Sequence, residues 1–258
     1  MSWKPHIEEV ATAMAQNRIT YLTQAVMAVE GRGEKLYCEC LARMVDLDGS
    51  VHAPMSFIPE LEACGDINLL DQHMVKLALE HLSRSSELVL GCDVSADTMQ
   101  EDAYWKSIRN LISARPELAT RLIIEVTETW PVISLERLTQ NITEARALGC
   151  RVAIDDFGDG YLSPAVLLKL EVDIVKIDAS MLRTIRSGIG RYSTFHHIVG
   201  FAKCIAPIVV VEGVENADDL ELSLMAGATH VQGHFIERPM PTAMSLRQAG
   251  AYSTPRTA

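Results

Sequence analysis

Short runs of β-branched and other apolar residues alternate along the chain with longer amphipathic stretches. The apolar runs predict strands over residues 19–29, 35–42, 87–94, 121–126, 151–155, 172–178, 207–212 and 229–233. Helical patterns lie between most of them, over residues 69–84, 98–114, 135–148, 164–169, 192–205 and 217–226. This alternation favours mainly parallel pairing of the strands. Within 258 residues it predicts an α/β fold, a single-domain (β/α)8 TIM-like barrel. A doubly wound open sheet is the alternative, but no glycine-rich phosphate loop follows the first strand.

Composition narrows the class of protein. Hydrophobic residues at 48% and charged residues at 22% are ordinary for a soluble globular domain. No apolar run approaches the roughly 20 residues that a membrane helix needs, and the N-terminal MSWKPHIEEV lacks the apolar core of a signal peptide. We therefore expect a cytoplasmic domain that makes no membrane contact. The net charge of −11 argues against a nucleic-acid polymer as partner. A small phosphorylated ligand is compatible with this charge if the acids gather around metal ions.

Polar residues lie within or at the end of the predicted strands. They are Glu39, Asp93, Glu125, Asp155, Lys176, Glu212 and Gln232, and Asp156 directly follows Asp155. Strand ends carry the chemistry of barrel enzymes. A single acid there is commonly a helix cap or loop residue. Several unmatched carboxylates in one barrel mouth would repel one another, so they would need cations. Because the donors are all oxygen atoms, Mg²⁺ or Mn²⁺ is favoured over zinc.

The stretch LYCECLAR, residues 36–43, places an acid between two cysteines. None of the six cysteines forms a CxxC pair or a clustered Cys/His zinc spacing, and we expect them to be reduced and buried. In a strand, successive side chains alternate, so Cys38 and Cys40 share one face while Glu39 points to the other. This arrangement disfavours a thiolate metal site and makes the cysteines packing residues.

The ordered motifs resemble those of the EAL domain, the bacterial phosphodiesterase domain that hydrolyses cyclic di-GMP. The resemblance runs from about residue 19 to residue 241. The motifs are ECLAR (39–43, family Glu-Ala-Leu-x-Arg), EVTE (125–128), DDFGDGY (155–161), VDIVKID (172–178), EGVE (212–215) and QGH (232–234) with Arg238-Pro239. The expected organisation is a helical lead-in over residues 1–18, the EAL domain over 19–245 and a tail over 246–258.

The resemblance implies a role for each matching residue. The metal ligands would be Glu39, Asp93, Glu125, Asp155, Asp156 and Glu212, with Asp155 bridging two ions. The catalytic pair would be Lys176, which holds the attacking water, and Glu212 as general base. The substrate contacts would be Gln24, Leu41, Arg43 and Gln232. Glu128 would anchor the DDFG loop and Glu215 would be a supporting acid, although a capping or salt-bridge role explains these two equally well.

Four positions depart from the family pattern. Cys40 replaces the alanine of the Glu-Ala-Leu motif, Ala25 replaces a proline after Gln24, and Val211 replaces the alanine before EGVE. These three are apolar and are expected to affect packing rather than chemistry. Asp93 replaces an asparagine of the third-strand motif, so it adds one negative charge beside the expected first metal ion.

The implied reaction is hydrolysis of cyclic di-GMP to linear pGpG by water attack in bacterial signalling, with two Mg²⁺ or Mn²⁺ ions roughly 3.5–4 Å apart. Arg43 would neutralise a phosphate, and a homodimer near the DDFG loop is a family expectation. The alternative is a catalytically weak or inactive EAL domain that acts as a cyclic di-GMP receptor or a protein-interaction module. Such relatives typically lose several metal ligands, whereas this chain keeps its carboxylates and lysine. An unrelated metal-dependent barrel acting on sugars or enolates would require the ordered motifs to be coincidence.

Overall fold

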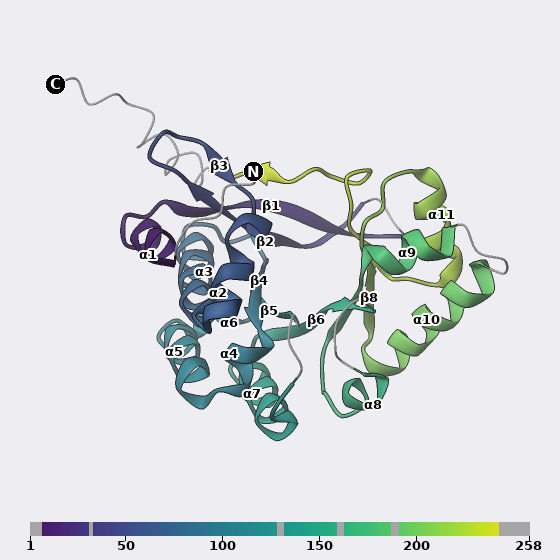
Figure 1. The fold of residues 1–258 in the computed structure, drawn as a ribbon. Helices are drawn as coiled ribbons and strands as arrows, with labels where there is room; N and C mark the ends of the chain where they lie inside the picture. Colours follow the sequence, from purple (N-terminus) through teal and green to yellow (C-terminus); the bar gives the residue numbers. More distant parts are fainter. Residues whose placement is uncertain (1–6, 31–32, 128–131, 159–162, 187–190, 243–258) are drawn as a thin grey trace.

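A closed barrel of eight strands lies at the centre of the molecule (Figure 1). The computed structural model describes residues 7–30, 33–127, 132–158, 163–186 and 191–242. The barrel strands are β1 (Ile19–Ala28), β2 (Lys35–Val45), β4 (Leu90–Ser95), β5 (Leu122–Thr127), β6 (Arg151–Phe157), β7 (Ile174–Ile177), β8 (Ile208–Val211) and β9 (His230–Val231). Because β1 pairs with both β2 and β9, the sheet closes on itself. The predicted barrel is therefore confirmed and the open sheet is excluded.

The first strand runs against its neighbours. β1 is antiparallel to β2 and to β9, whereas every pairing from β2 round to β9 is parallel. Residues 29–34 join β1 to β2, and so short a connection cannot carry the crossover that parallel neighbours require. Two short strands extend the sheet: β3 (Val51–His52) pairs with β2, and β10 (Met240–Pro241) pairs with β1.

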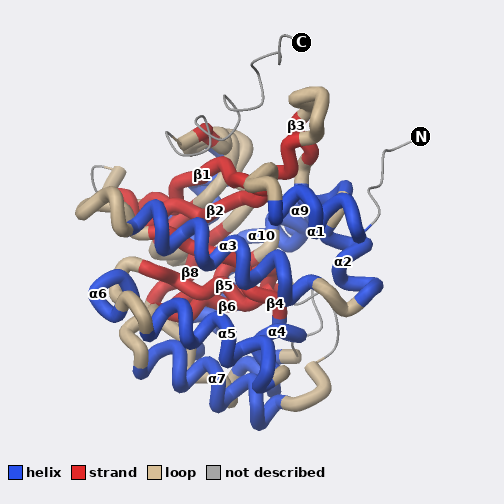
Figure 2. Tube along the Cα trace, turned by 90° about the vertical axis from the view of Figure 1, so that its left-hand side faces the viewer, coloured by secondary structure: helices blue, strands red, loops and turns tan. Residues whose placement is uncertain are grey.

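Helices surround the barrel, and α3, α5 and α7 cover the side seen in Figure 2. The helices are α1 (Ile7–Ala15), η1 (Pro54–Ser56), α2 (Ile58–Cys64), α3 (Ile67–Leu82), α4 (Ala96–Gln100), α5 (Asp102–Ser113), α6 (Pro116–Ala119), α7 (Leu135–Ala147), α8 (Pro164–Leu167), α9 (Ala179–Arg186), α10 (Arg191–Ile205) and α11 (Ala217–Ala226). The helix predicted over 98–114 is two helices, α4 and α5, because Glu101 between them has an extended backbone (φ −107°, ψ 113°).

The interior of the barrel is layered. An apolar cluster formed by Val26, Tyr37, Ile123, Ala153, Ile174 and Val210 fills it and is separate from the larger core between barrel and helices. Because side chains on a strand repeat their direction every two residues, the residue two positions away also faces the interior. On β5, for example, Ile123 is followed in this way by Glu125, and on β7 Ile174 is followed by Lys176. An apolar layer therefore lies beneath a polar one.

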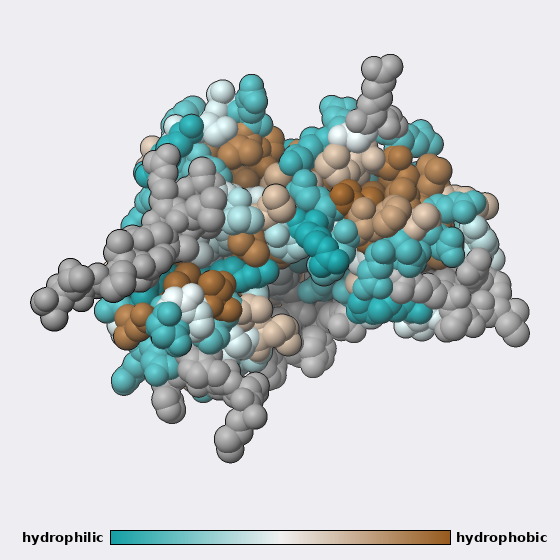
Figure 3. Space-filling model, turned by 90° about the horizontal axis from the view of Figure 1, so that it is seen from above, coloured by the Kyte–Doolittle hydropathy of each residue, from teal (hydrophilic) through white to brown (hydrophobic). Residues whose placement is uncertain are grey.

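The surface carries scattered apolar side chains. Seen from above, apolar residues form separate patches divided by hydrophilic ones (Figure 3). Leu47, Val51 and Met55 are among the exposed large apolar residues, close to the β2–β3 hairpin. Within the described ranges, no helix combines the length and the apolar character that crossing a membrane would require.

Candidate metal centre

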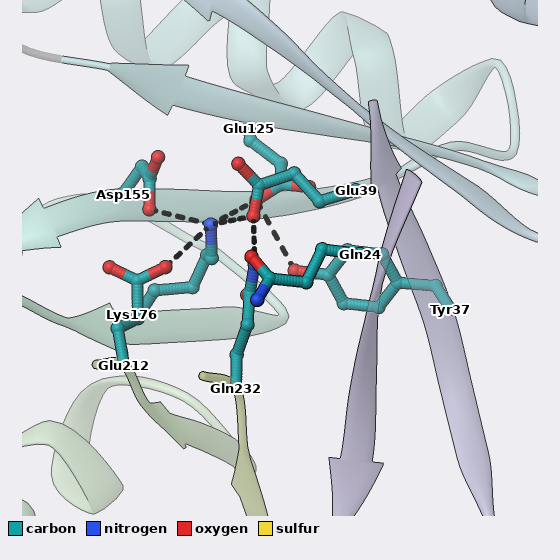
Figure 4. A network of polar contacts seen from close by, with 8 residues as sticks. All are labelled: Gln24, Tyr37, Glu39, Glu125, Asp155, Lys176, Glu212 and Gln232. Atoms are coloured by element: carbon teal, nitrogen blue, oxygen red, sulfur yellow. Dashed lines mark hydrogen bonds and ion pairs between the residues drawn. The ribbon is translucent and has the colours of Figure 1, made fainter. Parts of the chain in front are cut away.

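Lys176 of β7 stands at the centre of a ring of acids (Figure 4). Its Nζ lies 2.9 Å from Glu39 Oε2, 2.7 Å from Glu125 Oε2, 2.8 Å from Asp155 Oδ1 and 2.9 Å from Glu212 Oε1. The lysine side chain has no exposed surface. Three of the acids come from strands β2, β5 and β6, and Glu212 directly follows β8. Residues distant in sequence thus converge on one point at the mouth of the barrel.

The acids outnumber the single cation, and the pKa values reflect this. Burial alone would lower the pKa of Lys176, but the surrounding carboxylates outweigh it and hold this pKa well above its usual value. Burial, reinforced by Glu39 and Asp155 and opposed by Lys176, raises the pKa of Glu125 to about 8. Burial and the same acids also raise the pKa of Asp93 well above its usual value. The ring therefore favours additional positive charge, from protons or from metal ions.

One group of acids has the geometry of a cation site. Glu39, Asp93, Glu125 and Asp155 each offer an oxygen, and these atoms all lie within 4.8 Å of one another. Asp93 on β4 pairs directly with Glu125 on β5. Among the described residues, Asp93 Oδ1 and Glu125 Oε1 are buried without a hydrogen-bond partner. Buried polar atoms normally have a partner, so these oxygens fit a hard cation that prefers oxygen ligands.

A second group shares Asp155 with the first. Ligand atoms of Asp155, Asp156 and Glu212 lie within 4.8 Å of one another. Consecutive residues of a regular strand face opposite sides, but the pairing of β6 with β7 shifts between Ile154 and Phe157. Asp156 adopts a positive φ of 52° there, a conformation that aspartate tolerates better than most residues. This irregularity brings both aspartates to the mouth of the barrel.

Asp156 also has a perturbed carboxyl group, although the residue itself lies at the exposed edge of the mouth. Surrounding protein withdraws water from the carboxyl and, together with the charge of Asp155, raises its pKa to about 7. Burial likewise raises the pKa of Glu212 well above its usual value. Asp156 and Glu212 thus favour a bound proton or cation more than an ordinary carboxyl group does.

Gln232 contacts Glu39 and is itself in contact with Gln24 (Figure 4). Gln232 Nε2 donates to Glu39 Oε2 at 2.6 Å and to Gln24 Oε1 at 3.2 Å. Gln24 Nε2 in turn donates to the carbonyl oxygen of Glu237 at 2.8 Å. The amide of Gln24 is therefore engaged within the protein and orients Gln232.

Two cavities open beside the acids. One, of about 310 Å³, is lined by acids of both groups and by an apolar wall that includes Ile58, Ile67, Leu70 and Met74. The other, of about 250 Å³, is lined by Gln24, Leu41, Glu215, Gln232 and His234, among others. Leu41 borders both cavities. Neither lining, as formed by the described residues, contains a lysine or an arginine, so a ligand with anionic parts would match these cavities only with cations bound to the acids.

Two further predicted site residues, Arg43 and Glu215, lie apart from the ring. Arg43 Nη1 donates to the carbonyl of Ala42 at 2.7 Å, so its guanidinium turns toward its own strand. Glu215 is exposed at the second cavity, and its N–H donates to Asp219 Oδ2 at 3.0 Å. Glu128 and residues 159–162 of the DDFGDGY segment lie outside the described residues.

The thiols near Glu39 belong to a different environment. Cys38 and Cys40 are 5% and 1% exposed and belong to the core between barrel and helices. Burial raises the pKa of both thiols. In the described part of the chain, neither group of possible metal ligands contains a cysteine. The expected alternation is confirmed: Glu39 faces the other acids, whereas both thiols pack in the core, where Cys40 also borders the first cavity.

Sequence reasoning missed Tyr37 and Gly91, which lie directly beneath the ring. The Tyr37 hydroxyl donates to Glu125 Oε2 at 3.2 Å. A Cβ atom at Gly91 would lie 1.7 Å from Glu125 Oε1 and 2.5 Å from Tyr37 Cε2. The available signal was a glycine inside an apolar strand, which often marks a close approach by another group.

The chain is similar to known proteins of one family. The EAL domain family model matches residues 7–239. The cyclic di-GMP phosphodiesterase PdeF of Escherichia coli (strain K12) is 28% identical over 240 residues, which cover 92% of this chain but only 32% of PdeF. The chain thus spans about a third of that relative.

Solved structures share the fold. An EAL domain protein from Listeria monocytogenes EGD-e has a TM-score of 0.81 at 22% identity and covers 95% of this chain and 97% of its own. The PaMucR phosphodiesterase, solved in complex with c-di-GMP, has a TM-score of 0.77 at 23% identity and covers 93% and 98%. With the family match over most of the chain, the resemblance expected from the motifs is confirmed, and the chain belongs to the EAL domain family.

Proposed function

We propose that the chain hydrolyses one phosphodiester bond of cyclic di-GMP to give linear pGpG. The observation that carries this proposal is the first acid group, in which four carboxylates converge and two buried oxygens, on Asp93 and Glu125, have no hydrogen-bond partner in the described residues. The choice of substrate is supported by the relatives, of which PdeF is named as a cyclic di-GMP phosphodiesterase. A receptor without catalytic activity would have no need of so complete a ligand set.

Two divalent cations, Mg²⁺ or Mn²⁺, match the all-oxygen donors. The first would be held by Glu39, Asp93, Glu125 and Asp155, and the second by Asp155, Asp156 and Glu212. When bound, such ions supply Lewis acidity, which lowers the pKa of the attacking water and offsets charge on the phosphate.

The protein's own groups then position the reactants. The three N–H groups of Lys176 Nζ now face four carboxylates, so the lysine would donate to the attacking water, and fix its direction, once cations have drawn one of these acids away. Glu212 Oε1 lies 2.9 Å from that nitrogen, so a water held by the lysine lies within reach of the Glu212 carboxylate, which would accept its proton. Gln232, by donating to Glu39 Oε2, would keep that ligand in place.

The substrate would lie across the two cavities and contact Gln24, Leu41, Arg43 and Gln232. For Arg43 to reach a phosphate, its guanidinium must leave the carbonyl of Ala42, to which it now donates. We retain Glu128 as the anchor of the DDFG loop and Glu215 as a supporting acid. A homodimer near that loop and a cytoplasmic location stay predictions from the sequence.

The test is to incubate the purified chain with cyclic di-GMP and Mg²⁺ or Mn²⁺ and to separate the products by chromatography. Formation of pGpG that EDTA abolishes supports the proposal. Cyclic di-GMP binding without pGpG, under both metals, would instead favour the receptor function.

A further inference from the structure

Strand β4 differs from its neighbours in the apolar layer beneath the acids. On β5, β6 and β7 the residue two positions before the polar residue carries an apolar side chain, as with Ile123 before Glu125. On β4 this position is Gly91, two residues before Asp93. The missing side chain leaves a space inside the barrel, at the level of the apolar layer.

The ring of Tyr37 and the carboxylate of Glu125 share this space. A Cβ atom at Gly91 would lie 2.5 Å from Tyr37 Cε2 and 1.7 Å from Glu125 Oε1, so an alanine there would displace both. Tyr37 is 1% exposed and stands on β2, two residues before Glu39. Its hydroxyl reaches across to Glu125 Oε2 (Figure 4).

The two oxygens of Glu125 consequently have different surroundings. Oε2 accepts the Tyr37 hydroxyl at 3.2 Å and lies 2.7 Å from Lys176 Nζ. Oε1 is buried and has no hydrogen-bond partner in the described part of the chain. We infer that Tyr37 is a positioning residue, whose hydroxyl fixes the orientation of the Glu125 carboxylate for cation binding. This inference rests on the proposed function, in which Glu125 is a metal ligand.

A packing role alone does not account for the hydroxyl. The ring fills the space above Gly91, and a phenylalanine ring would fill it equally well. The hydroxyl adds a hydrogen bond to a carboxylate, and partners of this kind commonly change metal affinity by about 10- to 100-fold when removed. Tyr37→Phe therefore separates the two roles, because it keeps the ring and deletes only the donor.

Tyr21 provides a matched control. It is also 1% exposed and stands on the adjacent strand β1, but it belongs to the core between barrel and helices. Its hydroxyl makes a 2.7 Å hydrogen bond with His81 Nδ1, away from the acids. Tyr21→Phe thus loses one buried hydroxyl from the same kind of residue without touching the ring of acids.

The experiment measures Mn²⁺ binding directly, by calorimetry on metal-stripped protein, for the wild type, Tyr37→Phe and Tyr21→Phe. We expect Tyr37→Phe to bind at the first site about 10- to 100-fold more weakly and Tyr21→Phe to match the wild type. A Mn²⁺ affinity of Tyr37→Phe within threefold of the wild-type value would overturn the inference. An equal loss of Mn²⁺ affinity in Tyr37→Phe and Tyr21→Phe would also overturn it. If the wild type itself does not bind Mn²⁺, the proposed function fails together with the inference. If the wild type binds Mn²⁺ and Tyr37→Phe binds it equally well, only the inference fails, so the two failures are distinguishable.

A second measurement needs no variant. A cation on Glu125 draws electron density from the carboxylate and weakens the hydrogen bond that it accepts from Tyr37. Titration of the wild type with Mg²⁺ should therefore shift a tyrosine band in the near-ultraviolet difference spectrum. The midpoint of this shift should equal the midpoint of Mg²⁺ binding found by calorimetry. A spectrum unchanged through saturation would count against the inference.

Discussion

Lys176 Nζ lies 2.7 Å from Glu125 Oε2, and neither side chain has any exposed surface. A buried ion pair is stabilising only while both partners remain. Removing one partner leaves the other charge buried, unpaired and poorly solvated. Here a single ammonium group serves four carboxylates at once. The metal-free ring therefore depends on Lys176 for stability, whatever part the lysine plays in catalysis.

Lys176→Met should destabilise the metal-free protein by about 3–5 kcal/mol at pH 8. The folded-state pKa of Lys176 is raised, so its stabilising contribution is fully present below the unfolded pKa of about 10.4, including pH 8. The loss should shrink toward pH 5, where the raised pKa values of Glu125 and Glu212 let these acids take up protons. Urea unfolding in EDTA at both pH values measures this.

Two further readouts accompany this variant. Mn²⁺ should bind at least as tightly, because a competing cation is gone, while hydrolysis should be lost. Lys203→Met is the control, since Lys203 is exposed and donates to the carbonyl of Gly227. Weaker Mn²⁺ binding in Lys176→Met would contradict the view that the lysine and the metal balance the same acids.

Glu39→Gln should reduce hydrolysis at least 100-fold and leave the fold intact. Glu39 Oε2 accepts from both Lys176 and Gln232, and a neutral amide is a poor ligand for a hard cation. Steady-state rates at saturating Mn²⁺ test this, with Glu171→Gln as a control on an exposed acid that pairs with Arg146. Near-normal hydrolysis in Glu39→Gln would refute the assignment.

Cys38 and Cys40 should react slowly with a thiol reagent in the native protein, and Cys40→Ala should keep its activity. Both thiols are buried and their pKa values are raised, so little thiolate is available. The expectation that the cysteines are buried is wrong for Cys64 and Cys204, which are exposed and should react first. Mass spectrometry of partly labelled protein gives the order, and early labelling of Cys40 with loss of bound metal would revive the thiolate site.

Much of the ring was predictable because it depends on local rules. Period-two alternation assigned Glu39 and Cys40 to opposite faces, and strand ends located Asp93, Glu125 and Asp155. Parallel strands bring such ends together whatever the details of their register. The identity of the acids and of the lysine could therefore be predicted from the sequence and its motifs.

The remaining features depend on contacts between distant strands. That the Tyr37 ring occupies the space of Gly91 follows from how β2 lies against β4, which no local pattern encodes. The shifted pairing at Asp156 depends on the fit of β6 to β7. Only the short connection to β2 indicated that β1 is antiparallel to its neighbours. The strand–helix alternation of the rest of the chain indicated parallel pairing instead.

Asp71 should make stability fall as the pH rises from about 4 to about 6. Its Oδ2 accepts from Ser95 N–H, Ser95 Oγ and Thr98 Oγ1, but burial dominates and raises its pKa from 3.8 to about 6. Between these values the folded state binds more protons than the unfolded state, so stability decreases with pH and levels off above about 6. The shift corresponds to at most about 3 kcal/mol.

Asp71→Asn should remove this slope. An amide keeps an oxygen for the three donors and does not titrate, so the difference between wild type and variant isolates Asp71 from the acids of the ring. Urea unfolding in EDTA at several pH values from 4 to 7 gives the comparison, with Asp173→Asn as a control on a less buried acid that also accepts a backbone N–H. Parallel curves for wild type and Asp71→Asn would show that the pKa of Asp71 is not raised.

Asp93 is one of the four positions at which the sequence is expected to depart from the family pattern, and its charge should tune the site. Asp93→Asn keeps an oxygen of the same reach beside Glu125, its partner in the strand pairing, but removes one negative charge from the first acid group. Cation affinity should fall on the order of tenfold, because the electrostatic attraction is weaker. Asp93→Ala removes the oxygen as well and should lose much of both binding and turnover.

Hydrolysis by Asp93→Asn at saturating metal should be intact or faster, and its pH profile should move toward lower pH. A less anionic ligand set leaves the cation a stronger Lewis acid, which lowers the pKa of the attacking water. Removing a like charge also lowers the pKa values of the neighbouring carboxylates, so they release their protons at lower pH. Rates for the three proteins over a grid of Mg²⁺ and Mn²⁺ concentrations and pH values decide the matter. Identical metal midpoints in all three would mean that the unpartnered oxygen of Asp93 is not a ligand.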